Sequence, residues 1–146
     1  MKNIKFALYM ILTSILLNGC VSMNASSSYV DKMTPEEASV ISQSITKFVA
    51  KELPVASTTL ALMPPTGKGS AILTPILTYD LRHRGFAVAQ NGEPQKNIHS
   101  LQYIVTTFNN GILLRLQFDN IEASRWYSKD ALGVISSDNE PFAVRK

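Results

Sequence analysis

The fold is decided by the stretch LQYIVTTFNNGILLRLQFD, residues 101–119. Asn110-Gly111 near its middle is a strong short-range signal for a β-hairpin turn. Beyond this turn, apolar residues alternate with polar ones such as Arg115 and Gln117, which is typical of an antiparallel strand with one buried face. The stretch therefore predicts a hairpin with one face on a core and the other toward solvent.

The residues after the hairpin are expected to continue the sheet. Residues 121–129 form another candidate strand, in which Trp126 and Tyr127 point to opposite faces because side chains alternate along a strand. Weaker strands are expected near Val134 and over residues 142–145. The carboxyl-terminal part of the chain is therefore predicted to be a β-meander.

A helix is predicted to begin after Thr34. The sequence Thr34-Pro35-Glu36-Glu37 combines a capping hydroxyl, a proline at the first helical position and a glutamate three residues after the cap. Leu53-Pro54 ends the helix, and a strand is expected over residues 58–63 before Pro64-Pro65 stops it. The apolar face of the helix consists of Ala38, Ile41, Ile45, Phe48 and Val49.

A second helix is predicted over residues 70–84. Pro75 lacks the N–H of an interior helical residue, so either the regular helix starts near Thr74 or its first turns are bent. Arg82-His83-Arg84-Gly85 is interpreted as a helix stop rather than a basic binding patch, because cations favour the carbonyl end of a helix and glycine the position after it. Residues 86–90 then return as a strand and end at an Asn-Gly-Glu-Pro turn.

The expected fold is a small two-layer α+β sandwich. Two helices pack on a mainly antiparallel sheet, and the element order is helix, strand, helix and then four strands. A single periplasmic domain is predicted over residues 34–146. Residues 20–33 are predicted to be a flexible, serine-rich tether, because VSMNASSSYVDKM has neither a helical nor an alternating apolar pattern. A disordered leader with no role beyond spacing is the alternative.

The first nineteen residues have the parts of a secretory signal. Lys2 and Lys5 precede an apolar stretch over residues 6–17, and Gly19 precedes Cys20, the only cysteine of the chain. The twelve residues of the apolar stretch are too few to span a bilayer comfortably. A lone cysteine also excludes an intramolecular disulfide.

The residues Leu-Asn-Gly-Cys at 17–20 resemble the bacterial lipobox, although Asn18 replaces the usual small or aliphatic residue. We therefore expect cleavage between Gly19 and Cys20 and acyl chains on Cys20, each worth about 0.8 kcal/mol per buried CH₂. Val21 stands where an aspartate would resemble the inner-membrane retention signal, so the outer membrane is the expected location, with the domain facing the periplasm. The alternative is an uncleaved amino-terminal anchor with an incidental cysteine.

The basic character of the chain resides partly in this signal. Two of the fourteen Lys and Arg residues lie in it, whereas all eleven Asp and Glu residues follow it, which leaves the mature chain at a net charge of +1. Binding to nucleic acid by counterion release requires many phosphate contacts. An extended nucleic-acid surface is therefore not predicted.

No catalytic, cofactor or metal site is predicted. The chain has no Ser/His/Asp arrangement in a recognisable context, no thiol nucleophile once Cys20 is acylated, and no paired carboxylates in an apolar pocket. His83 between two arginines and His99 in a polar loop have no metal-binding partner at the required spacing. In residues 66–70, TGKGS, a second glycine interrupts the Lys-Ser pair of a phosphate-binding loop, so a plain turn is expected.

Two segments are similar to the TrbH family of conjugal-transfer lipoproteins: KELPVASTTLAL at residues 51–62 and LRHRGFAV at residues 81–88. That family also has a lipidated amino terminus, a helix that ends near a Leu-Pro-Pro-Ala-type segment, and an Arg-Gly-Tyr-Ala-Val-like junction. Here Val55 replaces the second proline and Phe86 replaces the tyrosine. The element order also resembles the small ring-forming N0 modules at the amino end of secretins and modules of type IV secretion lipoproteins.

The similarity covers residues 34–88 and extends more loosely through residues 124–127. It implies a structural accessory of a conjugative transfer or type IV secretion apparatus, not an enzyme. Its expected partners are other envelope subunits, in a homo- or hetero-oligomer, with no direct nucleic-acid contact. Trp126 and Tyr127 are candidate interface residues, and a core position for Trp126 is the alternative. The competing function is an outer-membrane lipoprotein that binds or activates a cell-wall enzyme.

Overall fold

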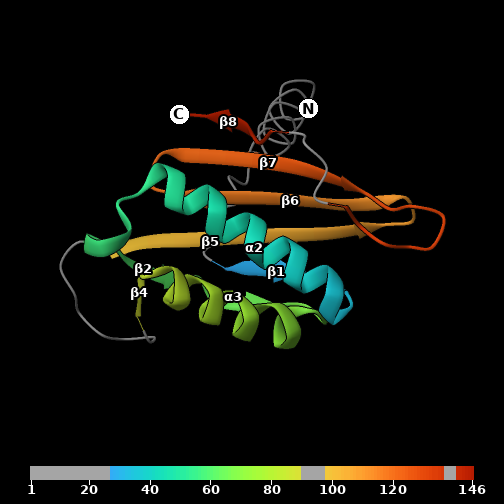
Figure 1. The fold of residues 1–146 in the computed structure, drawn as a ribbon, viewed down its shortest axis with the longest axis horizontal. Helices are drawn as coiled ribbons and strands as arrows, with labels where there is room; N and C mark the ends of the chain where they lie inside the picture. The colour runs from blue at the N-terminus through green and yellow to red at the C-terminus, as the bar shows by residue number, and fades with distance from the viewer. Residues whose placement is uncertain (1–26, 90–97, 137–140) are drawn as a thin grey trace, which may run out of the picture.

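The computed structural model describes residues 27–89, 98–136 and 141–146. In these residues the chain folds into two α-helices and an eight-stranded sheet, and both helices lie against the same face of the sheet (Figure 1). The predicted α+β sandwich with a mainly antiparallel sheet is therefore confirmed. Three predicted features lie outside the described residues: the signal with its cleavage site at Gly19 and Cys20, the first part of the tether, and the turn at residues 91–94.

The centre of the sheet is an antiparallel meander of its three longest strands. These are β5 (Ile98–Phe108), β6 (Gly111–Phe118) and β7 (Ile121–Ser128). Tyr103 pairs with Leu116 between β5 and β6, and the register continues from β6 to β7. The hairpin predicted from the alternating pattern is confirmed.

The hairpin turn lies one residue earlier than predicted. Phe108 pairs with Gly111, so the two turn residues are Asn109 and Asn110, and Gly111 is the first residue of β6. Among the described non-glycine residues only Asp119, in the next turn, has a positive φ, at 51°. The first turn therefore does not use the positive φ angles that an Asn-Gly type I′ turn requires, and Gly111 serves another purpose, described below.

One face of the meander forms the core together with the helices. Side chains alternate between the two faces of each strand, and the inward set is almost completely buried. Tyr103 spans the two layers, since its hydroxyl lies 2.9 Å from Thr74 Oγ1 of the second helix. The inward residues of the three strands include Leu101, Tyr103, Val105, Ile112, Leu114, Leu116, Phe118, Ile121, Ala123 and Tyr127.

Helix α2 (Pro35–Glu52) begins at the predicted capping box. The Glu37 N–H donates to Thr34 Oγ1 at 3.2 Å, and the Thr34 N–H donates to Glu37 Oε2 at 2.9 Å. Glu37 also forms an ion pair with Lys129, whose Nζ lies 2.8 Å from Oε1, and its side chain is only 7% exposed. The same carboxylate thus starts the helix and ties it to the residue after β7.

Helix α3 (Ser70–Arg84) contains Pro75 in its interior. Of the two alternatives, a start near Thr74 is therefore wrong. The predicted stop is confirmed: Gly85 adopts φ 109°, its N–H donates to the Arg82 carbonyl, and the N–H of the following residue reaches back to Leu81. A glycine in this conformation satisfies carbonyls that the end of a helix leaves free.

The tether predicted up to residue 33 contains a strand. Strand β1 (Ser28–Val30) pairs in parallel with β5 and with β3 (Pro65–Thr66). Val30 and Met33 are both buried in the core. The prediction of a tether is wrong for this segment, because backbone pairing to a distant strand orders residues whose local sequence has no strand pattern. The ordered part of the chain begins before residue 34.

The first residues of β5 also take part in parallel pairing. Strand β2 (Thr59–Leu62) follows a 3₁₀ turn (Val55–Ser57) and pairs in parallel with β4 (Ala87–Ala89) and with the first residues of β5. His99 therefore lies in a strand, opposite Leu60, and not in the predicted loop. No helix in the described part of the chain is long and apolar enough to cross a membrane.

The last strand, β8 (Ala143–Arg145), pairs antiparallel with β7, as predicted for this segment. Near Val134 the structure has only an isolated bridge between Lys129 and Ile135, so the weak strand predicted there is reduced to one pair. Strand β8 covers only the first half of β7.

We expect Glu37→Ala to lower the free energy of unfolding by about 2 kcal/mol, because it removes the side-chain bond to the Thr34 N–H and the ion pair with Lys129. Glu37→Gln retains a capping side chain and loses only the ion pair, so its cost is expected to be roughly 1 kcal/mol. Urea unfolding of the two variants measures the difference. Equal stability of both variants and the parent would show that Glu37 does not join α2 to the sheet.

Candidate interaction face

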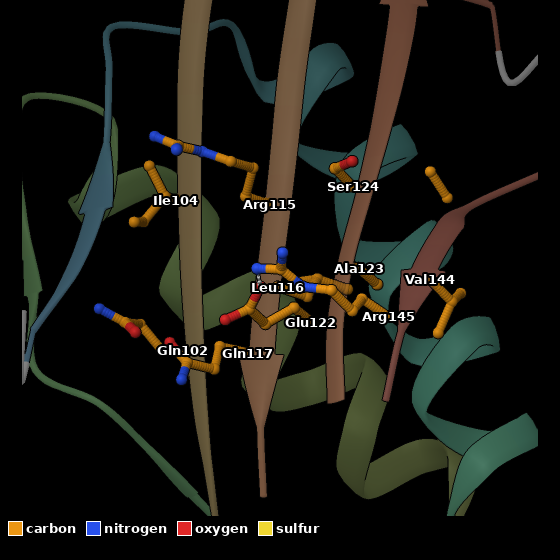
Figure 2. A pocket seen from close by; sticks show the side chains of 11 residues that line it. Gln102, Ile104, Arg115, Leu116, Gln117, Glu122, Ala123, Ser124, Val144 and Arg145 are labelled. Atoms are coloured by element: carbon orange, nitrogen blue, oxygen red, sulfur yellow. Dashed lines mark hydrogen bonds and ion pairs between the residues drawn. The ribbon is translucent and has the colours of Figure 1, made fainter. Parts of the chain in front are cut away.

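The face of the sheet that points away from the helices carries the candidate functional residues. Figure 2 views the sheet from this side, with the helices behind the strands. Because the inward set of each strand is fixed by the core, the alternate residues must point outward. No helix of the described residues covers them. We call this surface the open face; it comprises Gln102, Ile104, Thr106, Phe108, Leu113, Arg115, Gln117, Glu122, Ser124, Trp126, Ser128, Ala143 and Arg145.

One end of the open face is aromatic. The rings of Phe108 and Trp126 lie with their centroids 5.7 Å apart, and Phe108 is 46% exposed. The indole N–H of Trp126 donates to Ser128 Oγ at 3.2 Å. Gly111 makes room for the indole, since a Cβ at this position would lie 2.4 Å from Trp126 Cζ2. Trp126 is therefore held in one orientation on the surface.

The other end of the open face is a hollow of about 490 Å³ with a mixed polar and apolar lining. Arg115 on the central strand β6 has Ile104 and Ser124 as its cross-strand neighbours, and Ser124 is paired in turn with Ala143 (Figure 2). The side chains of Ser124 and Ala143 are small and stand beside the long side chain of Arg115, so space remains above the sheet. The remaining lining includes Gln102, Gln117 and an ion pair between Glu122 and Arg145.

The two aromatic residues predicted for an interface have separate environments. Trp126 lies on the open face and outside the core, so the core alternative for it is wrong. Tyr127 is only 1% exposed. Its prediction as an interface residue is wrong, because its side chain points toward the helices, where the Arg125 guanidinium lies 5.0 Å from the centre of its ring. Burial also raises the pKa of the Tyr127 hydroxyl above its ordinary value.

The remaining predicted sites are not brought to the open face. Gly19 and Cys20 lie outside the described residues. The sequence predicts no metal site at His99. In the structure its Nδ1 lies 2.6 Å from Asp119 Oδ2, and this contact joins the start of β5 to the turn after β6. Within the ranges that the structure describes, no group of three or more His, Cys, Asp or Glu residues is placed to hold a metal ion.

The sequence pattern identified part of the open face. Arg115 and Gln117 were placed on a polar face by the alternation in β6. Phe108 and the hollow were missed, since they depend on which residues of β5, β7 and β8 stand opposite β6. A usable signal was the alternation in residues 101–108, which places Phe108 on the same face as Gln102.

Comparison with known families gives one finding. The sequence model of the family described as conjugal transfer protein TrbH matches residues 21–141. This range includes every described residue from Ser27, just before β1, to Pro141, which lies two residues before β8. No curated protein and no solved structure matches the chain.

We expect Gly111→Ala to displace Trp126 from the hairpin, because the new Cβ would overlap the indole, and to cost roughly 1–3 kcal/mol of stability. Trp126 is the only tryptophan, so its fluorescence emission reports the change directly. Gly133→Ala is the control for a glycine substitution that strains the chain without touching the indole, because its φ of 78° disfavours alanine but no atom lies within 4 Å of a Cβ there. An unchanged emission maximum in the Gly111 variant would show that the indole does not rest on this glycine.

Proposed function

This chain belongs to the TrbH family of conjugal transfer proteins, and we propose that it is a structural accessory subunit of a conjugative transfer or type IV secretion apparatus. In this proposal the protein is a lipoprotein of the outer membrane, and its domain faces the periplasm. It acts by holding other envelope subunits through protein contacts. The observation that carries the proposal is the family match over residues 21–141.

In this proposal, lipid attachment at Cys20 holds the protein at the outer membrane. The lipobox-like residues 17–20 and the short apolar stretch before them support this step. Acyl chains confine the domain to a membrane surface, which raises its effective concentration near other membrane-bound subunits. A modest interface is then sufficient for stable occupancy.

The open face supplies the contact in this proposal. The exposed Phe108 and the half-buried Trp126 form an aromatic pair. Aromatic residues together with arginine dominate the binding energy of protein interfaces. Since Trp126 is already held by Gly111 and Ser128, little side-chain freedom is lost when a partner binds. The occupant that we propose is another protein subunit of the transfer apparatus.

Lipid attachment predicts a defined mature amino terminus. Mass spectrometry of the protein from membranes is expected to show Cys20 as the first residue, carrying two or three acyl chains. Cys20→Ala is expected to lose the acyl chains and to leave the outer-membrane fraction. An unprocessed wild-type chain of full length would instead establish the uncleaved anchor, and a leader cut elsewhere with no fatty acid would refute lipidation.

The contact on the open face predicts that Trp126→Ala weakens partner binding by roughly 2 kcal/mol, the loss typical of a central aromatic anchor. Copurification of envelope subunits and the frequency of conjugal transfer are the two measurements. Phe108→Ser removes the other ring of the pair at an exposed position and is expected to act in the same direction. Leu132→Ala is the control, because Leu132 is also exposed but lies outside the open face.

Normal transfer and normal copurification in both aromatic variants would refute the open face as the contact. Recovery of a peptidoglycan synthase in place of transfer subunits would establish the competing function at the cell wall.

A further inference from the structure

The chain enters β1 from the side of the open face. Ser27 is the residue directly before this strand, and its carbonyl accepts a hydrogen bond from Gln102 Nε2 at 2.8 Å. Gln102 belongs to the open face and lines the hollow there (Figure 2). Its amide therefore holds the backbone of Ser27 on the side of the sheet that the helices do not cover.

The other approaches to β1 are occupied by described residues. Within the plane of the sheet, the Met63 N–H donates to the Leu101 carbonyl at 2.9 Å, so Met63 precedes β1 along the same edge of β5. On the outer side, the Pro64 carbonyl accepts the Ser28 N–H at 2.9 Å. Ser28 itself is completely buried. The side of the open face is what the described part of the chain leaves for the residues before Ser27.

The distance between this entry and the proposed lipid anchor is short. Seven residues, 21–27, separate Cys20 from Ser28. A chain of this length reaches at most about 28 Å when fully extended. The predicted serine-rich tether would span about 15 Å on average. With Cys20 lipidated, the start of β1 stays within this range of the membrane surface.

The outer side of the helices is less accessible to the same anchor. To bring α2 against lipid, the tether must pass β3 at the edge of the sheet and then cross the helix layer. This path is roughly 20 Å, given strand spacings of about 5 Å and helix diameters of about 10 Å. It exceeds the average span of the tether, so it requires a nearly extended chain and a loss of conformational entropy.

We propose that the lipid anchor turns the open face toward the outer membrane, so that the subunit bound on this face lies between the domain and the lipid headgroups. The inference rests on the proposed function, which supplies the lipid and the partner. It adds the kind of partner: a segment next to the partner's own membrane anchor. A single helix of about 10 Å diameter fits within the reach of the tether.

The charges of the open face agree with this orientation. Among its described residues, Arg115 and Arg145 outnumber the one acidic residue, Glu122. Anionic lipid headgroups attract a positive surface. The electrostatic contribution therefore acts in the same direction as the short tether.

The test measures energy transfer from tryptophan to dansyl-labelled headgroups in phosphatidylethanolamine and phosphatidylglycerol vesicles that carry the lipidated protein. Trp126, the only tryptophan, lies on the open face. The matched variant combines Trp126→Phe with Lys47→Trp, which moves the donor to an exposed position on the side of α2 away from the sheet. Transfer is expected to be roughly threefold or more stronger from Trp126, because the donors differ in height by more than a helix diameter. Equal or stronger transfer from the Lys47→Trp variant would overturn the orientation.

Insertion of about twenty Gly and Ser residues after Val21 tests the cause. The longer tether lets either side of the domain reach the membrane, so most of the difference between the two donors is expected to disappear. A difference that survives the insertion would refute the short tether as its origin.

The partner is tested in cells that carry out conjugal transfer. A photo-reactive residue at Gln117 on the open face is expected to link to a peptide next to a membrane-spanning or lipid-anchored segment of another subunit. The same residue at Gln43, exposed on α2, is the control. A linked peptide remote from any membrane anchor would refute the membrane-adjacent partner.

The outcomes separate this inference from the proposed function. Cys20→Ala is expected to abolish energy transfer from both donor positions. If the parent protein shows no transfer from either position, lipid attachment is refuted and the orientation with it. If transfer is strong from the Lys47→Trp variant and weak from Trp126, lipid attachment stands and the orientation is refuted.

Discussion

Strand β5 has strand partners on both of its edges, and the rest of the structure depends on this. Strand β6 pairs along one side, while β2 and then β1 occupy the other side in succession. Its inward residues Leu101, Tyr103 and Val105 are completely buried, so a slip of one residue would bring polar side chains into the core. The core therefore fixes the register of β5 and β6. The same register decides which side chains share the open face, and with them the aromatic pair and the hollow.

Local chemistry made the two helices and the meander predictable. The capping box at Thr34, the glycine stop at Gly85 and the alternation through β6 each follow from neighbouring residues, and the structure has all three. The parallel strands could not be predicted in this way. Strand β1 lies in a serine-rich segment, and it is ordered by pairing with a strand 75 residues away, where the Tyr103 N–H donates to Ser28 Oγ at 3.1 Å. Nothing in the local sequence reports such a contact.

The open face was likewise predictable only where its features depend on neighbouring residues in the sequence. Alternation alone assigned Arg115 to the polar side of its strand and separated Trp126 from Tyr127. It did not show which of the two aromatic side chains would be buried, because that depends on where the helices lie. The hollow was also beyond prediction, since it arises from Ser124 and Ala143 standing beside Arg115 on different strands. In this chain, such features are set by the strand register and not by a contiguous motif.

The position of β1 has a mechanical consequence under the proposed attachment through Cys20. Any pull transmitted from the residues before Ser28 reaches this strand first, and β1 lies parallel to β5 between that strand and β3. Tension along the strand axis loads all of its backbone hydrogen bonds together, in shear, whereas peeling would break them one after another. Under that proposal, the short strand would distribute a pull on the amino terminus over its hydrogen bonds to β3 and β5.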